Sequence, residues 1–199
     1  VGDSTFAKTV KIETIVPYRL KVRLNTKTPV LSDGQTYRAN LNAEYLFGGT
    51  ASGLDSEVQI EITESRLEVP GFEGFSFDSD AVDIQPITQR IFDGSLNKNG
   101  EAEIEYSLPK LYFADSPLSL TARAKVFESG GRFSEHSGEA KIYPFDAWVG
   151  YKRPESERRQ LQTGEAVEVP VVVADRGGNV LEGRKLQYTV YHSQRYWRS

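Results

Sequence analysis

Three aspartates, Asp78, Asp80 and Asp83, are the side chains in this sequence best suited to hold a metal ion. Carboxylate oxygens bind Ca²⁺, but an EF-hand loop also needs glycine at its sixth position and glutamate at its twelfth. Counted from Asp78, those positions hold Asp83 and Gln89. The spacing therefore excludes an EF-hand. A looser calcium loop remains an alternative, but a solvated turn is favoured because aspartate is common in turns.

The two histidines, His136 and His192, are the next candidates for catalysis or metal binding. They fall in different predicted domains, so neither a histidine-based zinc site nor a Ser-His-Asp triad is supported. The segment SEHSG around His136 does not match the G-x-S-x-G motif of hydrolases. The chain has no cysteine, which excludes disulfides, zinc–thiolate sites, catalytic thiols and thioesters within these 199 residues.

The glycine-rich turn Gly48–Leu54, within EYLFGGTASGLDSEVQIEI, has the composition of a phosphate-binding loop. A phosphate cradle, however, places backbone N–H groups at the start of a helix, and the P-loop adds a lysine. Here the alternating run Val58–Ile62 predicts a strand after the turn, and no lysine is nearby. We therefore interpret Gly48–Leu54 as a strand connection that uses the conformational freedom of glycine.

The remaining polar and aromatic clusters have structural interpretations. Acidic residues alternate with apolar ones, as on the solvated face of a strand, whereas a glycosidase acid needs a buried site. Lys152–Arg159 mixes both charges around a proline and is interpreted as a solvated loop. The aromatics Tyr191, Tyr196 and Trp197 could stack on a sugar, but packing within a domain core is preferred. The sequence thus predicts no catalytic, cofactor-binding or metal-binding residue, and no enzyme.

Apolar residues recur at every second position along most of the chain, as at Val58, Ile60 and Ile62. This alternation predicts half-buried strands, and turns rich in glycine and asparagine separate the runs. We expect strands at 19–24, 36–47, 56–63, 84–92, 101–108, 118–128 and 132–143. Seven strands without intervening helices predict an all-β, immunoglobulin-like antiparallel β-sandwich.

A second set of alternating runs begins after Tyr143-Pro144. We expect its strands at 147–151, 166–174 and 185–191. The middle run carries Val167, Val169, Val171 and Val173 on one face. We predict that residues 17–143 form one sandwich and that residues 144–199 begin a second, incomplete one. Residues 1–16, which alternate between residues 5 and 15, are expected to be the final strand or a linker of a preceding domain.

The overall composition narrows the function further. The net charge is −4, with acidic and basic residues interspersed, so there is no electrostatic case for nucleic acid or an anionic membrane as a partner. No apolar run approaches the ~18 residues of a transmembrane helix. The chain starts at Val1 without an initiator methionine or a visible signal peptide, so we expect it to be a piece of a longer protein.

Five segments of the sequence, beginning with VKIETIVPYRLKVRL and YLFGGTASGL, resemble the bacterial alpha-2-macroglobulin family. VKIETIVPYRLKVRL is similar to the family's Val-Pro-x-Arg-hydrophobic junction, here at Val16–Leu20. YLFGGTASGL (Tyr45–Leu54) is similar to its Tyr-Leu-Tyr/Phe-Gly-x-Pro-Ala-x-x-Leu motif, with Thr50 in place of the usual proline. PGFEGFSFD, LNKNGEAEIEYSL and the segment from VGYKRPE to the aromatic end also resemble the family, so that the likeness covers nearly the whole chain.

The resemblance implies tandem macroglobulin-type sandwiches within a large protease-trapping inhibitor. In that family a protease cleaves a bait segment, the molecule rearranges around it, and many members also carry a Cys–Gln thioester. The implied partners are neighbouring macroglobulin domains, target proteases and peptidoglycan-synthesis proteins, at a periplasmic or cell-surface location with a lipid anchor on the full-length protein. An immunoglobulin-like adhesin or carbohydrate-binding module is the alternative, which saturable binding on a glycan array would support.

Overall fold

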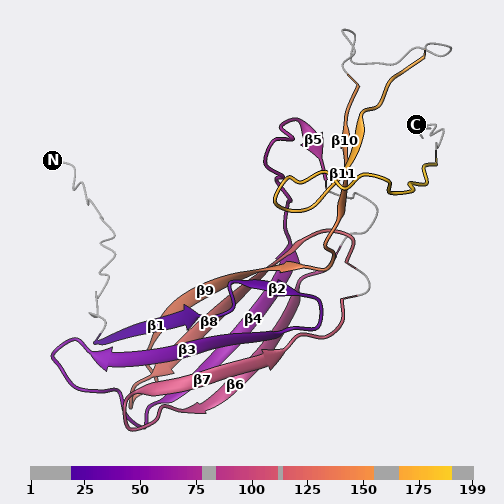
Figure 1. Ribbon diagram of the computed structural model, residues 1–199. Helices are drawn as coiled ribbons and strands as arrows, with labels where there is room; N and C mark the ends of the chain where they lie inside the picture. Colours follow the sequence, from indigo (N-terminus) through magenta and orange to yellow (C-terminus); the bar gives the residue numbers. More distant parts are fainter. Residues whose placement is uncertain (1–18, 78–83, 112–113, 155–165, 190–199) are drawn as a thin grey trace, which may run out of the picture.

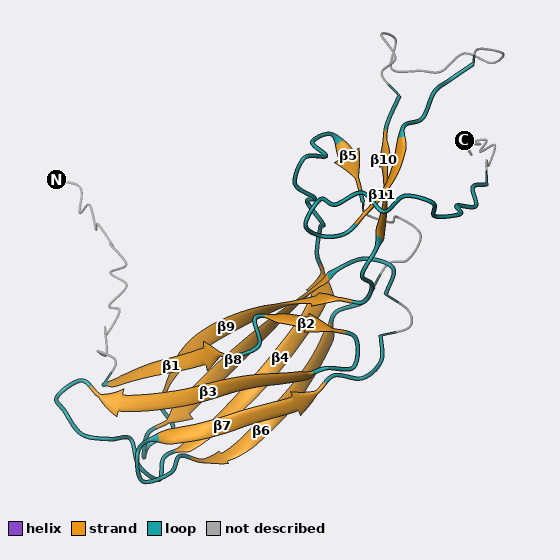
Figure 2. Cartoon of the chain, in the orientation of Figure 1, coloured by secondary structure: helices purple, strands orange, loops and turns teal. Residues whose placement is uncertain are grey.

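The chain folds into strands and loops, and no helix occurs in the part described by the computed structural model, residues 19–77, 84–111, 114–154 and 166–189 (Figures 1 and 2). The strands are β1 (Leu20–Thr26), β2 (Val30–Ser32), β3 (Thr36–Tyr45), β4 (Asp55–Glu64), β5 (Phe75–Ser76), β6 (Ile87–Ser95), β7 (Glu101–Ser107), β8 (Leu118–Phe127), β9 (Phe133–Tyr143), β10 (Trp148–Lys152) and β11 (Val171–Ala174). The predicted all-β fold is confirmed.

Two sheets form a sandwich. One has the strand order β1-β3-β7 and the other β2-β9-β8-β4-β6. Pairing is antiparallel except that the three-residue β2, which was not predicted, runs parallel to β9. The sheets approach at both edges, where the Leu24 amide donates to Nδ1 of His136 (3.2 Å) and the Tyr106 hydroxyl donates to Oε1 of Gln89 (2.7 Å).

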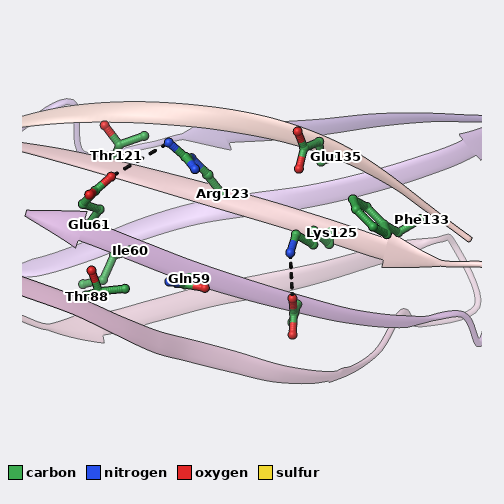
Figure 3. Close-up of a pocket in the computed structure, with 10 residues that line it drawn as sticks. Gln59, Ile60, Glu61, Thr88, Thr121, Arg123, Lys125, Phe133 and Glu135 are labelled. Carbon is green, nitrogen blue, oxygen red and sulfur yellow. Dashed lines mark ion pairs between the residues drawn. The ribbon is translucent and has the colours of Figure 1, made fainter. Parts of the chain in front are cut away.

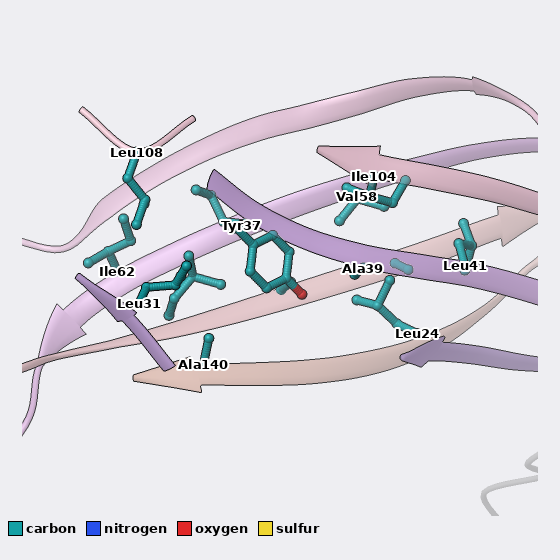
Figure 4. Close-up of a cluster of buried hydrophobic side chains, with 14 of the residues drawn as sticks. Leu24, Leu31, Tyr37, Ala39, Leu41, Val58, Ile62, Ile104, Leu108 and Ala140 are labelled. Atoms are coloured by element: carbon teal, nitrogen blue, oxygen red, sulfur yellow. The ribbon is translucent and has the colours of Figure 1, made fainter. Parts of the chain in front are cut away.

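The core lies between these sheets and contains the apolar residues of the predicted alternation (Figure 4). In β4 the buried positions are Ser56, Val58, Ile60 and Ile62. Successive side chains of a strand point to opposite faces, so the intervening acidic residues of β4 lie on the solvent side. In β3 the alternation ends earlier than predicted. That strand stops at Tyr45, and Leu46 and Phe47 are exposed because they belong to the turn.

A smaller third sheet, β11-β10-β5, follows the sandwich. Its β5 was not predicted and comes from the loop after β4, far from β10 in sequence. The predicted strand at 166–174 shortens to β11, and Val167 and Val169 are exposed loop residues. The predicted strand at 185–191 is wrong over residues 185–189, which are irregular. Residues 190 and 191, like the run from residue 5 to 15, lie outside the described residues.

The stability of this core depends on pH through the buried phenol of Tyr37. The side chain is fully buried, and its hydroxyl lies 3.1 Å from Oγ1 of Thr26. Burial raises the pKa of Tyr37 above its usual 10.0, although the Thr26 contact opposes the shift. The native state therefore favours the neutral phenol, and this stabilisation is complete below the unfolded pKa and is lost as the pH rises past it.

We expect the unfolding free energy of the native chain to fall above about pH 10 more steeply than that of Tyr37→Phe. At neutral pH the substitution should cost only about 1 kcal/mol, because it removes one hydrogen bond and keeps the ring. Urea unfolding of both proteins across the alkaline range measures the difference. Identical pH profiles would contradict this expectation, since they would mean that folding does not change the pKa of Tyr37.

Candidate functional sites

The Gly48–Leu54 turn is a closed strand connection. Gly48 and Gly49 have φ angles of 94° and 103°, which non-glycine residues rarely adopt. Several backbone amides of the turn already have partners. Those of Gly48, Ala51 and Gly53 donate to the carbonyls of Tyr45 (3.0 Å), Ala43 (3.3 Å) and Leu96 (3.0 Å). A strand, β4, follows the turn, so it offers no helix N-terminus for a phosphate.

His136 lies on β9 as an exposed residue, and its Nδ1 accepts the Leu24 amide of β1. This contact holds the edges of two strands together and uses one of the two ring nitrogens. Among the described residues, no group of three or more histidine, aspartate and glutamate side chains is placed to hold a metal ion. Asp78, Asp80, Asp83 and His192 lie outside the described residues.

Two other predicted features also fall partly or wholly outside the described chain. Of the loop Lys152–Arg159, only residues 152–154 are described, and Lys152 ends β10. The aromatics Tyr191, Tyr196 and Trp197 are not in the described part. The described ranges contain no helix that could span a membrane.

The outer face of the larger sheet carries a network of charged side chains (Figure 3). Glu57 pairs with Arg90 (3.5 Å) and with Lys125 (3.4 Å), and Glu61 lies 3.9 Å from Arg123. Lys125 also lies 5.0 Å from the ring centroid of Phe133. These ion pairs face solvent, so each contributes about 1 kcal/mol or less to stability. The charge of each acidic side chain is balanced by a neighbouring cation. The arrangement is that of a solvated sheet face.

A second apolar cluster forms the core of the third sheet. Its buried members are Leu67, Val69, Phe77, Trp148 and Ala174, and Tyr143 at the end of β9 packs against it. The first three come from the segment between β4 and β6, where the sequence predicts no strand. The signal that could have revealed it is PGFEGFSFD, where Phe75 and Phe77 have strand spacing and Phe72 packs with them edge-on (5.5 and 6.1 Å).

Two glycines allow the close approach of the segments at this junction. A Cβ on Gly150 of β10 would lie 2.5 Å from ring atoms of the buried Phe77. A Cβ on Gly178 would lie 2.4 Å from the carbonyl oxygen of Pro70. Since the second obstacle is backbone, no side-chain rotation relieves it. The β4–β6 loop and the β11 turn are therefore packed backbone to backbone.

The turn after β11 is shaped by Asp175. Its Oδ1 accepts the amides of Gly177 (2.8 Å) and Asn179 (2.9 Å), and its Oδ2 accepts Nδ2 of Asn179 (2.8 Å). The Asn179 side-chain and backbone bonds hold the pKa of the Asp175 carboxyl below its usual range. The adjacent Arg176 guanidinium lies 5.2 Å from the ring centroid of Tyr143, at the end of β9. The Asp175 bonds stabilise the turn itself, and the Arg176–Tyr143 contact joins it to the end of the sandwich.

The opposite face of the third sheet is apolar and uncovered by the described residues. β10 and β11 pair Val149 with Val173 and Tyr151 with Val171. Val149 is 50% exposed, Tyr151 39% and Val171 51%. A sheet with one buried and one exposed apolar face is half of a sandwich.

Comparison with known proteins is consistent with this architecture. The profile of the bacterial alpha-2-macroglobulin MG5 domain matches residues 18–144. The alpha-2-macroglobulin of Escherichia coli strain K12 is 26% identical over 171 residues, which cover 84% of this chain and 10% of that protein. That of Xylella fastidiosa strain Temecula1 is 25% identical over 143 residues, covering 72% of this chain and 9% of that protein.

Solved structures show the same fold. The native conformation of E. coli alpha-2-macroglobulin aligns with a TM-score of 0.61 at 24% identity, over 82% of this chain and 11% of that one. Salmonella alpha-2-macroglobulin reacted with methylamine aligns with a TM-score of 0.60 at 23% identity, over 84% of this chain and 12% of that one. This chain thus spans about a tenth of the length of its curated relatives. On the match of the MG5 domain to residues 18–144, the chain belongs to the bacterial alpha-2-macroglobulin family.

Proposed function

We propose that this chain is a non-catalytic scaffold segment of a bacterial alpha-2-macroglobulin-like inhibitor that traps proteases. Family membership supports the proposal, since the relatives are alpha-2-macroglobulins of which this chain covers about a tenth. Two solved relatives are described as E. coli alpha-2-macroglobulin activated by trypsin and by porcine elastase. Trapping is accordingly assigned to the parent protein, and this segment is assigned part of its frame.

Two observations support the scaffold role: the glycine-rich turn is closed by internal hydrogen bonds, and the third sheet exposes an apolar face. Several amides of the glycine-rich Gly48–Leu54 turn donate to carbonyls of the same chain. In contrast, the third sheet leaves Val149, Tyr151 and Val171 exposed as an apolar face. Apolar surface that is left open on a sheet favours packing against a further domain of the same chain rather than chemistry on a small molecule.

We expect the 199-residue chain alone to inhibit no protease. A tight reversible inhibitor presents a preorganised loop over an interface of about 1,600 Å² in total. The Gly48–Leu54 turn is only a short strand connection closed by its own hydrogen bonds. A panel of serine, cysteine and metalloproteases, assayed with peptide and protein substrates, measures this. Stoichiometric loss of activity on either substrate would contradict the passive role and would direct mutagenesis to Gly48–Leu54 and Glu73–Asp83.

The proposal also covers where the parent protein is located and which proteins it works with. We place the parent protein in the periplasm or at the cell surface, held by a lipid anchor and working beside peptidoglycan-synthesis proteins. The resemblance to bacterial macroglobulins supports this placement. Fractionation of cells expressing the tagged parent protein, followed by crosslinking of the membrane fraction, tests it. Recovery of the parent in the cytoplasmic fraction would contradict it.

A further inference from the structure

The tip of the β3–β4 turn presents two neighbouring large apolar side chains to solvent. Leu46 is 63% exposed and Phe47 is 77% exposed. The ring of Phe47 stacks on that of Tyr45, with centroids 5.0 Å apart. Isolated exposed apolar residues are common on proteins. Two adjacent ones beside the ring of Tyr45 form a contiguous patch, and contiguous patches mark interaction surfaces.

The backbone beneath this patch is fixed. The Tyr45 amide donates to the Gly49 carbonyl (3.0 Å), and the Gly48 amide donates to the Tyr45 carbonyl (3.0 Å). Immediately afterwards Thr50 forms a β-bridge with Glu44, and Ala51 is fully buried. The turn is thus anchored on both sides, so that little conformational entropy remains to be lost when a partner covers Leu46 and Phe47.

The patch lies where the chain enters the sandwich. The Leu46 amide donates to the carbonyl of Arg19 (2.8 Å), and Leu20 of β1 pairs with Tyr45 of β3. Arg19 is the first described residue, and 18 residues precede it in this chain. The chain therefore enters the sandwich beside the patch, and a domain that the parent protein carries before Arg19 is tethered on this side at a high effective concentration.

The outgoing chain leaves from the other end of the sandwich. β8 pairs its last residues with the start of β4 and its first residues with the end of β9. Tyr143, at the end of β9, therefore lies at the end opposite the β3–β4 turn, as does the third sheet (Figure 1). Domains that follow β11 begin far from Leu46 and Phe47, which makes the preceding domain the better-placed occupant.

We propose that Leu46 and Phe47 are the docking contact for the domain that precedes Arg19 in the parent chain. The inference rests on the tandem-domain arrangement in the proposed function. Covering the two side chains removes apolar area from water, and the aromatic ring acts as the anchor that such contacts favour. The turn then orients the sandwich relative to its upstream neighbour, in addition to the covalent link at residue 18.

Thiol labelling tests this docking directly, because the 199-residue chain has no cysteine of its own. Leu46→Cys places a thiol at the patch and keeps the Phe47 ring that anchors the contact, and Thr88→Cys places one on the charged outer face of the larger sheet as the matched control. Both positions are exposed, so neither variant should impair folding. Maleimide labelling rates are read by mass spectrometry on the peptide that carries each thiol, in the 199-residue chain and in the full-length parent.

We expect residue 46 to be labelled about tenfold more slowly in the parent than in the 199-residue chain, with residue 88 unchanged. Deleting the part of the parent before residue 19 should restore the fast rate. Equal rates at residue 46 would overturn the proposal. So would protection that survives the deletion, since it would assign the patch to a second copy or to another domain. Protease trapping by the same preparations reports the proposed function separately, so either hypothesis can fail alone.

Discussion

Ile60→Asp is expected to destabilise the sandwich severely. Ile60 is fully buried at the middle of β4, paired with Gln89 of β6 on one side and Ala122 of β8 on the other. A carboxylate at this position has no cation to pair with among the buried residues, and an unpaired buried charge costs about 3–5 kcal/mol. Domains are stable by only about 5–15 kcal/mol, so we expect the melting temperature in circular dichroism or calorimetry to fall by roughly 6–20 °C.

Gln59→Asp is the matched control, because it introduces the same side chain one residue earlier. Gln59 is exposed, and its register places it opposite Arg90 of β6 and Arg123 of β8. Aspartate is a poor strand former, but here it faces two cations, so the change should cost about 1 kcal/mol or less. Gln59→Lys is a weaker control, since it would add a third positive charge between the arginines. Similar melting temperatures for the Ile60 and Gln59 variants would mean that the faces of β4 are reversed.

Gly178→Ala is expected to loosen the packing of the β11 turn on the β4–β6 loop within the third sheet. Gly178 has φ of 88°, and an added Cβ would lie 2.4 Å from the Pro70 carbonyl oxygen. The left-handed conformation costs an alanine about 1–2 kcal/mol, and relieving the backbone contact adds about 1–3 kcal/mol more. The apolar cluster around Trp148 should then open at lower urea concentration than the core around Ile60, and hydrogen exchange of β10 and β4 amides measures the two separately.

Gly183→Ala isolates the contribution of that contact. Gly183 has a similar φ of 70°, but a Cβ there meets nothing within 4 Å. Its replacement should therefore carry only the conformational cost, about 1–2 kcal/mol. The difference between the two variants measures the packing of the β11 turn on Pro70. If both alanine variants leave β10 equally protected, the third sheet is held by the chain connection alone.

The sandwich was largely predictable, because its strands have one wet and one buried face. The alternation of Val58, Ile60 and Ile62 with acidic residues identifies β4 and its orientation without any knowledge of partners. The same is true of β1, β3, β7, β8 and β9. Strand ends are less visible, since apolar turn residues such as Leu46 and Phe47 continue the pattern of β3 after its hydrogen bonding has stopped.

The short strands β2 and β5 and the third sheet could not be predicted from the local sequence pattern. β2 and β5 have three and two residues, too few for a period to show, and both exist only because a distant strand accepts them. The third sheet also draws its core from two separated segments, so the role of Phe77 depends on Gly150 leaving space for it. The exposure of Leu46 and Phe47 likewise required the structure, because a sequence does not state where a turn ends.

The most direct test of the scaffold account is the activity of a protease mixed with the full-length parent protein. Trapping leaves the active site of the caged protease free, so we expect hydrolysis of a small peptide substrate to persist while hydrolysis of a large protein substrate is lost. A parent protein lacking residues 19–189 should lose this discrimination, because the frame is broken. Equal loss of activity on both substrates would contradict the account, since it would mean that the active site is blocked directly. Unchanged activity on both would contradict it as well, since no protease would have been enclosed.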